Sequence, residues 1–387
     1  MSQTSPLKDR TAIAGIGQTV FGKGLPDSEL ALACRAIKLA LEDAGIDAKE
    51  VDGLVSYSMQ TAEEDEVSSA LGLGDLTFFS RLPAGGGGSA GTVCHAALGV
   101  ATGQADVVVA YRSRKRSSRA SRVWMQTDER VDRPREMWTR PWGVVRPVDE
   151  LALFMRRYMQ QYGATREHLA NIAVAFRAHA NRNPAAFMHS RPMSREEYMA
   201  ARWISDPLCL FDCCLETDGA MAAVIVSAER AKDLKQKPVY IHAVAQGVVS
   251  ESATMANFFS EDPLHTQAHA CAKSLWRQSD IQPADIDVAQ MYDAFTPEIF
   301  FCLEAYGFCK RGEGAAFTEN GNISLGGKLP LNTSGGGLSE VYLHGFNMIV
   351  EGVKQMRGTS TAQVPDAESC FVCASDLNPT GAFVLRR

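Results

Sequence analysis

The stretches "GGGGSAGTVCHAALGVATGQADV" (residues 85–107) and "NTSGGGLSEVYLHGFNMIVEGVKQMRG" (residues 332–358) share one plan, and this plan decides the fold. Each begins with a run of glycines and continues into a segment that has apolar residues at helical spacing. Because the plan occurs once in each half of the chain, we expect an internal duplication. Two unrelated α/β domains are the alternative interpretation.

The flanking sequence alternates between strand and helix patterns. "RTAIAGIGQTVFG" (10–22) is typical of a short buried strand, and "DSELALACRAIKLALEDAGI" (27–46) is typical of an amphipathic helix with an acidic first turn. In the second half, "KPVYIHAVAQGVV" (237–249) and "IDVAQMYDAF" (286–295) predict strands. This alternation indicates an α/β fold with a largely buried sheet.

The alternation stops between residue 112 and about residue 200. This part holds basic runs, helical stretches and three tryptophans, Trp124, Trp138 and Trp142. We interpret it as a loop domain inserted into the first half. The expected units are therefore residues 1–235, which contain the loop domain, and residues 236–387.

Composition narrows the class of protein. A chain of 387 residues is long enough for two core units, and 45% hydrophobic with 22% charged residues is usual for a globular protein. The net charge of −6 argues against nucleic acid as the main partner. The N-terminal residues lack the apolar segment of a secretory signal, and no apolar run reaches the roughly 20 residues needed for a membrane span. With ten cysteines read as reduced thiols, we expect a cytoplasmic location.

The cysteine spacing does not favour a metal site. Cys370 and Cys373 lie on a predicted strand, where residues three apart face opposite sides. The cluster Cys209, Cys213 and Cys214 has no second ligand pair at zinc-finger spacing. We therefore expect no bound metal.

Five short motifs then carry a family resemblance. They are, in chain order, "GQADVVVA", "CCLETDGAMAAVIVSAERA", "YDAF", "NTSGGGLSEVYLHG" and "CASD" followed by "GA". Together they resemble the thiolase superfamily, and most its sterol-carrier and lipid-transfer branch. The resemblance implies two βαβαβ halves in a five-layered αβαβα arrangement, with an inserted loop domain. It also implies a homodimer.

The departures from the thiolase pattern fall at the acyl-transfer positions. The family's nucleophilic cysteine aligns with Gly85 or Gly86, and Cys94 lies two turns deeper in the helix, where a buried core cysteine is expected. The family's Gly-His-Pro histidine aligns with Tyr342, and its Asn or His before "EAF" or "DAF" aligns with Tyr292. On a continuous helix, His344 lies roughly 200° around from Tyr342, so we expect it to face elsewhere.

A tyrosine relays acyl groups poorly, but its hydroxyl can give and take a proton. Proton exchange without a nucleophile suits a lyase that cleaves a β-hydroxyacyl-CoA by a retro-aldol reaction. We expect Tyr342 to act as the base and Tyr292 as the acid, and the sequence leaves the reverse assignment open. Two other functions also stay open: a non-catalytic acyl-CoA or lipid-binding protein, and a thiolase or acyltransferase with an unusual cysteine.

A subgroup of the branch resembles the chain in both tyrosines: the aldolases that end sterol and bile-acid side-chain degradation. This resemblance implies cleavage of a 17-hydroxy steroid acyl-CoA into a 17-ketosteroid and propionyl-CoA. Coenzyme A would enter only as part of the substrate, with no other cofactor. The resemblance further implies a small OB-fold partner protein, often linked to a hydratase that makes the substrate.

Several secondary candidates accompany the tyrosines. Asp293, His344 and Cys373 lie near them in the sequence or match family positions, and are candidates for oxyanion or supporting roles. The run "RSRKRSSRASR" (112–122) supplies guanidinium groups that suit CoA phosphates, with a solvated loop or a dimer contact equally open. Its candidates for CoA binding are Arg112, Arg114, Lys115 and Arg116. In the loop domain, His179 and Asn183 match family spacing, or only cap and pack.

Overall fold

The computed structural model describes residues 5–83, 85–117, 139–250, 260–377 and 379–387. Its main sheet has nine strands in the spatial order β3-β2-β4-β7-β1-β8-β11-β10-β9. In chain order these strands are β1 (Thr11–Gln18), β2 (Gly53–Tyr57), β3 (Phe78–Leu82), β4 (Val107–Lys115), β7 (Asp218–Ser227), β8 (Val239–Gly247), β9 (Val288–Met291), β10 (Ser369–Cys373) and β11 (Thr380–Arg386). β5 (Trp203–Ser205) and β6 (Leu208–Cys209) form a separate small pair.

The strand pairing repeats between the two halves. In the first half, β2 is parallel to β4, and β4–β7 and β7–β1 are antiparallel. In the second half, β9 is parallel to β10, and β10–β11 and β11–β8 are antiparallel. The halves join where residues 11–13 of β1 pair with residues 239–241 of β8. The two expected sheets are therefore continuous through this short antiparallel contact.

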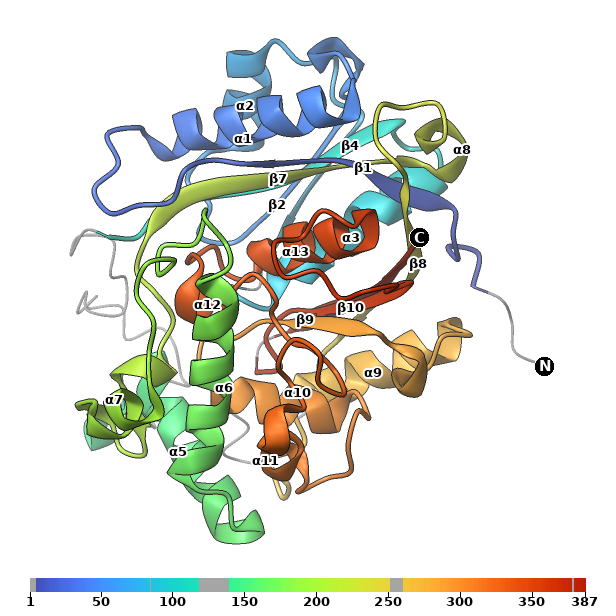
Figure 1. Cartoon of the computed structure of the whole chain (residues 1–387). Coiled ribbons are helices and arrows are strands. Elements are labelled where there is room, and N and C mark those ends of the chain that lie inside the picture. Colours follow the sequence, from blue (N-terminus) through green and yellow to red (C-terminus); the bar gives the residue numbers. More distant parts are fainter. Residues whose placement is uncertain (1–4, 84, 118–138, 251–259, 378) are drawn as a thin grey trace.

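The helices form three layers around the strands (Figure 1). One outer layer holds α1 (Glu29–Ala44) and α2 (Glu64–Leu71), and the central layer holds α3 (Gly88–Ala101) and α13 (Phe346–Arg357). The other outer layer holds α9 (Gln267–Gln278), α10 (Pro297–Ala305) and α11 (Gly314–Phe317). Two shorter helices, α8 (Ala228–Ala231) and α12 (Gly336–Ser339), lie in connections. The predicted five-layered thiolase-like arrangement is confirmed.

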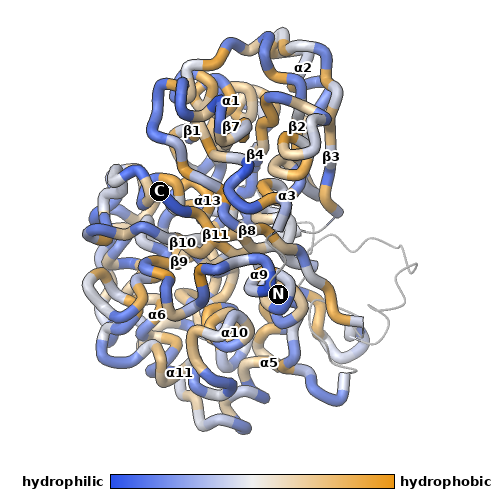
Figure 2. Tube along the Cα trace, turned by 90° about the vertical axis from the view of Figure 1, so that its right-hand side faces the viewer, coloured by the Kyte–Doolittle hydropathy of each residue, from blue (hydrophilic) through white to orange (hydrophobic). Residues whose placement is uncertain are grey.

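Three buried cores correspond to these layers, and Figure 2 shows hydrophobic residues concentrated along the strands and the central helices. The central core includes Val93 of α3 and Ile349 of α13. α3 lies very close to β11, because a Cβ at Gly381 would be 2.7 Å from the backbone nitrogen of Gly91. Cys94 belongs to this core and is 2% exposed, which confirms its expected packing role.

The ends of the outer helix α1 follow local sequence rules. The Ser28 side chain accepts a hydrogen bond from the Ala31 amide at 3.1 Å, and Gly45 ends the helix in the left-handed region at φ 75°. Between these caps, the apolar face packs on β1, β4 and β7. The caps at both ends and the burial of the apolar face therefore stabilise the same helix, α1.

The inserted region packs on the second half. Its described helices are α5 (Pro147–Tyr162), α6 (Arg166–Ala180) and α7 (Arg195–Ala200). Tyr158 of α5 stacks on Phe300 of α10 with ring centroids 5.7 Å apart. Strand β4 runs to Lys115, so the first residues of the region expected from about 112 belong to this strand. Trp124, Trp138 and residues 118–122 of the basic run lie outside the described residues. Within the described ranges, no helix is long and apolar enough to cross a membrane.

Candidate active site

Tyr342 and His344 face each other in a turn between α12 and α13. The expected continuous helix is interrupted, because His344 (φ 51°) and Gly345 (φ 84°) adopt left-handed backbone conformations. This turn brings the rings to a centroid separation of 4.7 Å, and the Tyr342 hydroxyl hydrogen-bonds to His344 Nε2. The expectation that His344 faces away from Tyr342 is therefore wrong, since it assumed helical geometry at these residues.

The ring of Tyr292 lies against Gly86, one of the two glycines that align with the nucleophile of a thiolase. Tyr292 follows β9, and its amide donates to the Cys373 carbonyl at 3.1 Å. A Cβ built on Gly86 would lie 2.4 Å from Tyr292 Cε1 and 3.0 Å from its hydroxyl oxygen. A Cβ on Gly345 would lie 2.8 Å from Cδ2 of the same ring. Gly86 therefore cannot be a cysteine while Tyr292 keeps this position.

Basic side chains of the strand β4 face Tyr342 and His344. Val108 and Ala110 point into the central core, and the two-residue repeat of a strand places Arg112 on the same face. There, Arg112 Nη2 hydrogen-bonds to His344 Nδ1, and Arg116 Cζ lies 5.6 Å from the centroid of the Tyr342 ring. Arg112, Arg114 and Arg116 are all buried, so a solvated basic loop is the wrong interpretation for them.

Protein groups already engage the CoA-binding candidates. Arg112 Nη1 donates to the Tyr57 and Ser58 carbonyls, each at 2.9 Å. Arg114 Nη1 donates to the Met59 carbonyl, and Lys115 Nζ donates to the Leu25 carbonyl at 2.6 Å. Phosphate binding by these side chains stays a prediction. The contact of Arg112 with His344 favours a role inside the site for that arginine, whereas Lys115 contacts Leu25 and Glu29.

The environments of the two tyrosines differ in charge. Burial raises the pKa of Tyr342 to about 12, and the neighbouring Arg116, Arg114 and Arg112 act against this rise. Burial raises the pKa of Tyr292 well above its ordinary value, and the neighbouring Tyr342 and Cys214 add to this rise. Burial also lowers the pKa of His344 far below its ordinary value, and the arginines lower it further. His344 is therefore neutral at physiological pH, and Tyr342 forms a phenolate more readily than Tyr292.

The other sequence candidates have distinct positions. Asp293 accepts hydrogen bonds from the amides of Gly337 (2.7 Å) and Leu338 (3.2 Å), and burial raises its pKa to about 8. Its carboxyl group thus holds the glycine turn before Tyr342. Cys373 Sγ lies 3.8 Å from Cys302 Sγ in the outer core, whereas Cys370 lies in the central core. The predicted opposite facing of this cysteine pair is confirmed, and the thiol of Cys373 points away from the central layer.

Two residues of the loop domain brace the segment that carries Tyr342. His179 Nδ1 lies 3.3 Å from the Asn332 carbonyl, and its Nε2 accepts from the Leu325 amide at 3.1 Å. Asn183 Nδ2 donates to the Ser334 carbonyl at 3.2 Å and to Glu340 Oε1 at 3.1 Å. These contacts agree with a capping and packing role for His179 and Asn183.

Sequence reasoning missed two residues of the site. Cys214 is half-buried, and its amide donates to the Ala294 carbonyl at 2.8 Å, which places it beside the "YDAF" turn. The Tyr57 hydroxyl donates to the Leu343 and His344 carbonyls at 2.9 and 3.2 Å. Cys214 stands in the motif that begins "CCLETDG", which marks the fold and not a chemical role, and Tyr57 lies in none of the five motifs. The alternation of arginines at 112, 114 and 116 is a signal that could have placed these side chains on one strand face.

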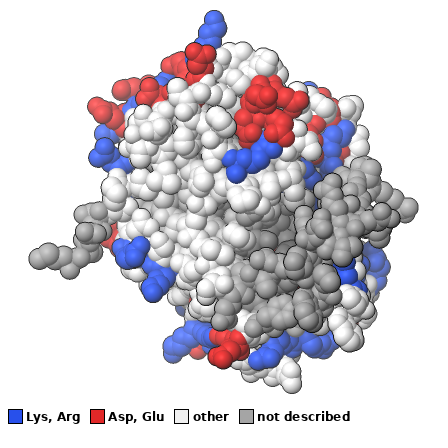
Figure 3. All heavy atoms as spheres, turned by 180° about the vertical axis from the view of Figure 1, so that it is seen from behind, with Lys and Arg blue, Asp and Glu red and all other residues white. Residues whose placement is uncertain are grey.

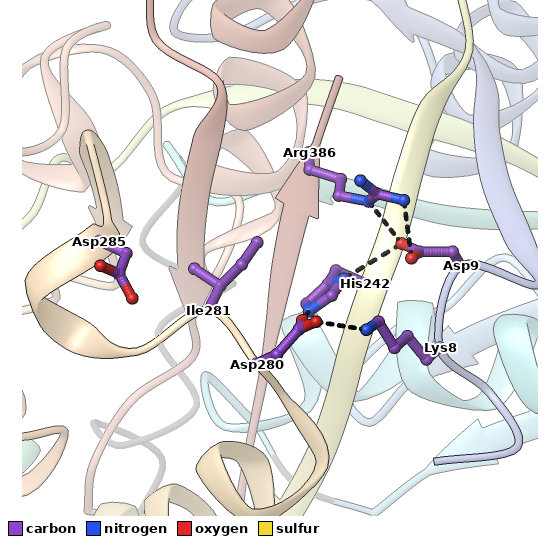
Figure 4. A pocket seen from close by; sticks show the side chains of 7 residues that line it. All are labelled: Lys8, Asp9, His242, Asp280, Ile281, Asp285 and Arg386. Atoms are coloured by element: carbon purple, nitrogen blue, oxygen red, sulfur yellow. Dashed lines mark hydrogen bonds and ion pairs between the residues drawn. The ribbon is translucent and has the colours of Figure 1, made fainter. Parts of the chain in front are cut away.

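A surface pocket beside His242 of β8 is lined by charged side chains, which link the N-terminal segment to the second half by ion pairs (Figure 4). His242 Nδ1 is 3.1 Å from Asp9, and His242 Nε2 is 2.7 Å from Asp280. Lys8 pairs with Asp280 at 2.5 Å, and Arg386 pairs with Asp9 at 2.8 Å. The carboxylates of Asp9 and Asp280 both have cationic partners, which indicates a structural role. Among the described residues, no group of three or more His, Cys, Asp or Glu side chains could hold a metal ion.

Comparison with known proteins identifies the family of the chain. The N-terminal domain model of thiolase matches residues 10–229, and a thiolase C-terminal domain-like model matches residues 250–377. The chain is 44% identical to the 17-hydroxy-3-oxo-4-pregnene-20-carboxyl-CoA lyase of Mycobacterium tuberculosis, over 98% of this chain and 100% of that protein. It is 43% identical to a steroid side-chain-cleaving aldolase of Thermomonospora curvata, over 98% and 99% of the two chains. The solved structure of an Ltp2-ChsH2(DUF35) aldolase superposes with a TM-score of 0.94, at 42% identity and 99% coverage of both chains.

The chain belongs to the thiolase superfamily. Within that superfamily it groups with the steroid side-chain-cleaving acyl-CoA aldolases, as the sequence motifs predicted.

Proposed function

We propose that this protein is a steroid acyl-CoA aldolase, which cleaves a 17-hydroxy steroid side-chain CoA ester into a 17-ketosteroid and propionyl-CoA. One observation carries the proposal: the ring of Tyr292 fills the space beside Gly86, where a cysteine side chain would collide with it, and this supports a phenol in place of a nucleophile. The 44% and 43% identical relatives are named as a lyase and an aldolase of steroid side chains, which supports the same reaction for this chain.

The reaction needs two proton transfers and no oxidant or reductant. The phenolate of Tyr342 takes the proton of the 17-hydroxyl group while the bond between the α and β carbons breaks. The electron pair of that bond passes into the thioester as an enolate, and the β carbon becomes the ketone. Tyr292 then donates its proton to the α carbon, which gives propionyl-CoA. The proton held by Tyr342 returns to Tyr292 and resets the site. Coenzyme A enters only as part of the substrate.

The assignment of base and acid follows from the charges around each phenol. Environments that push two pKa values apart separate the base from the acid. Arg112, Arg114 and Arg116 act against the rise in the pKa of Tyr342, whereas the main neighbours of Tyr292 raise its pKa. Tyr342 is therefore the tyrosine that ionises, and Tyr292 is the one that keeps its proton. Gly86, which packs against the Tyr292 ring, comes two residues before the start of α3 at Gly88. The backbone amides at this end of the helix carry partial positive charge that favours an enolate oxygen.

A direct assay separates this function from its alternatives. The purified chain is incubated with a 17-hydroxy steroid CoA ester, and ketosteroid and propionyl-CoA are measured by mass spectrometry. Equimolar formation of both products is expected. Acyl transfer to free CoA, without ketone release, would instead indicate a thiolase, and binding of the ester with no product would indicate a lipid-binding protein.

We also propose a homodimer that forms through the edge strand β3. β3 ends the sheet, and Phe79 on it is 71% exposed. Leu98 on the adjacent α3 is also exposed. Seen from behind, the molecule has a broad area without charged side chains, bordered by acidic and basic groups (Figure 3). By contrast, the opposite edge strand β9 is covered, because Ala289 pairs with Leu331. Sedimentation of the Phe79→Asp variant tests this dimer: the wild type should sediment as a dimer and the variant as a monomer.

We propose a second partner, the small OB-fold protein that the sequence resemblance links to a hydratase. The structure with a TM-score of 0.94 is titled as an Ltp2-ChsH2(DUF35) aldolase, which supports a complex of this kind. We expect this assembly to work in the cytoplasm. Co-expression with a DUF35 protein from the same gene neighbourhood should increase the yield and turnover of the chain. Full solubility and activity of the chain alone would contradict an obligate complex.

A further inference from the structure

His344 lies between a cation and the tyrosine proposed as the base. One nitrogen of its ring, Nδ1, hydrogen-bonds to Arg112 Nη2, and the other, Nε2, hydrogen-bonds to the Tyr342 hydroxyl. All three side chains are buried: His344 is 4% exposed and Arg112 is fully buried. The three residues come from β4 and from the turn before α13, so the chain of contacts crosses between the two halves of the fold.

The chemistry of arginine fixes the direction of both hydrogen bonds. A guanidinium group has only donors, so Nδ1 of His344 must accept from Arg112. A neutral imidazole with an accepting Nδ1 carries its proton on Nε2. Nε2 must then donate to the oxygen of Tyr342. We infer that Arg112 and His344 are positioning residues that hold a single imidazole tautomer and so stabilise the phenolate of Tyr342.

Surrounding contacts prevent the ring from turning over. The Tyr57 hydroxyl donates to the carbonyls of Leu343 and His344, which fixes the backbone of the turn. Arg112 is fixed in turn by the Tyr57 and Ser58 carbonyls, and its guanidinium lies 4.1 Å from the centroid of the Tyr57 ring. The N–H of His344 therefore points at the phenol before any substrate arrives, as preorganised stabilisation requires.

The charged and titratable groups facing this pair come from several elements. β4 contributes Arg112 and Arg114, Arg116 comes directly after this strand, and β2 contributes Tyr57. Tyr292 comes from the turn after β9, and Cys214 from the segment before β7. The positive charge of the arginines favours the phenolate of Tyr342. It also disfavours the imidazolium form of His344, in which both ring nitrogens carry a proton. His344 is thus a hydrogen-bond donor to Tyr342 and not itself the base.

This inference rests on the proposed function only for its catalytic meaning, because the tautomer and the phenolate pKa can be measured without substrate. In the wild type, ¹⁵N NMR of histidine should show one imidazole that is protonated on Nε2 and stays neutral at acidic pH. This signal should be absent in the His344→Gln variant. A signal for an Nδ1-protonated or doubly protonated ring at this residue would overturn the inference.

Two variants of His344 separate the hydrogen bond from the backbone conformation. Gln keeps a side-chain N–H at the reach of Nε2. Asn accepts the left-handed backbone at φ 51° more readily but ends near the position of Nδ1. The pKa of Tyr342 is then measured by NMR of ¹³Cζ-labelled tyrosine, with Tyr342→Phe assigning the signal. We expect His344→Asn to raise this pKa by about one to two units and to lower kcat/KM by about 10- to 100-fold, as for loss of a hydrogen bond to a charged group. His344→Gln should restore most of both.

The outcomes distinguish the two claims. If both variants leave the pKa of Tyr342 unchanged, the positioning role is wrong, even if the aldolase reaction is observed. If the pKa shifts as expected but no steroid CoA ester is cleaved by the wild type in complex with its partner, the proposed function is wrong and the hydrogen-bond chain stands. Circular dichroism and thermal melting verify that both variants are folded.

Discussion

Gly86→Ala is the substitution that most directly perturbs the position of Tyr292. The new Cβ would lie 2.4 Å from Tyr292 Cε1, 2.9 Å from Cζ and 3.0 Å from the hydroxyl oxygen, whereas ordinary contacts begin near 3.4 Å. The ring must therefore move by about 1 Å, and a misplacement of this size costs about 10²-fold in rate. Gly345 lies against Cδ2 of the ring, with a built Cβ at 2.8 Å, so there is little room for this movement.

The neighbouring glycine supplies a matched control. A Cβ on Gly85 would have its nearest neighbour, Met59 Sδ, at 3.9 Å, which is an ordinary contact. We expect Gly86→Ala to lower kcat for ketone release about 10²-fold and to destabilise the fold by roughly 1–3 kcal/mol through overpacking. Gly85→Ala should keep wild-type turnover and melting temperature. The assay follows ketosteroid formation by chromatography, with thermal melting of each variant. Turnover of Gly86→Ala within threefold of wild type would refute the argument that Tyr292 fills the nucleophile position.

Three further outcomes follow from the site and its surroundings. The base must be deprotonated to act, and burial raises the pKa of Tyr342 to about 12. We therefore expect kcat/KM to rise about tenfold per pH unit between neutral pH and pH 9. A flat pH profile would contradict a phenol base. Cys373→Ser should keep near-normal turnover, since Cys373 Sγ faces Cys302 in the outer core. If turnover fell more than tenfold in the folded variant, this thiol would have a catalytic role. Burial raises the pKa of Asp9, but its hydrogen bonds to His242 and Arg386 have the larger combined effect and lower this pKa overall. The ionised Asp9 therefore stabilises the fold above the ordinary pKa of about 4, and this contribution is lost as pH falls through the lower pKa of the folded state. Asp9→Asn should lower Tm by about 1–3 °C at neutral pH, and less at acidic pH, in calorimetry, as expected for a partly exposed ion pair.

The layered fold could be predicted because its signals are periodic. The apolar alternation of β1, the amphipathic pattern of α1 and the repeated glycine-helix plan all depend on spacing that the sequence states directly. The joining of the two sheets through β1 and β8 had no such signal, because only three residue pairs make this contact.

The site was predictable where it follows a motif and not where it depends on a turn. Tyr292 and Tyr342 occupy motif positions, and the structure brings both to the segment around Gly345. The orientation of His344 could not be predicted by helical spacing, because it depends on one left-handed residue that has a side chain. For Arg112 the sequence left CoA binding, a solvated loop and a dimer contact open, because its partners Tyr57 and His344 are more than 50 residues away in sequence.

The central claim is that two phenols carry out the proton transfers of a carbon–carbon cleavage. Its most direct test is the rate of ketosteroid release by Tyr292→Phe and Tyr342→Phe, each of which removes only a hydroxyl group. We expect kcat to fall by about 10² to 10⁴ in each variant, as is typical for loss of a general acid or base, with little change in melting temperature. Near-normal ketosteroid release by both folded variants would contradict the two-tyrosine mechanism.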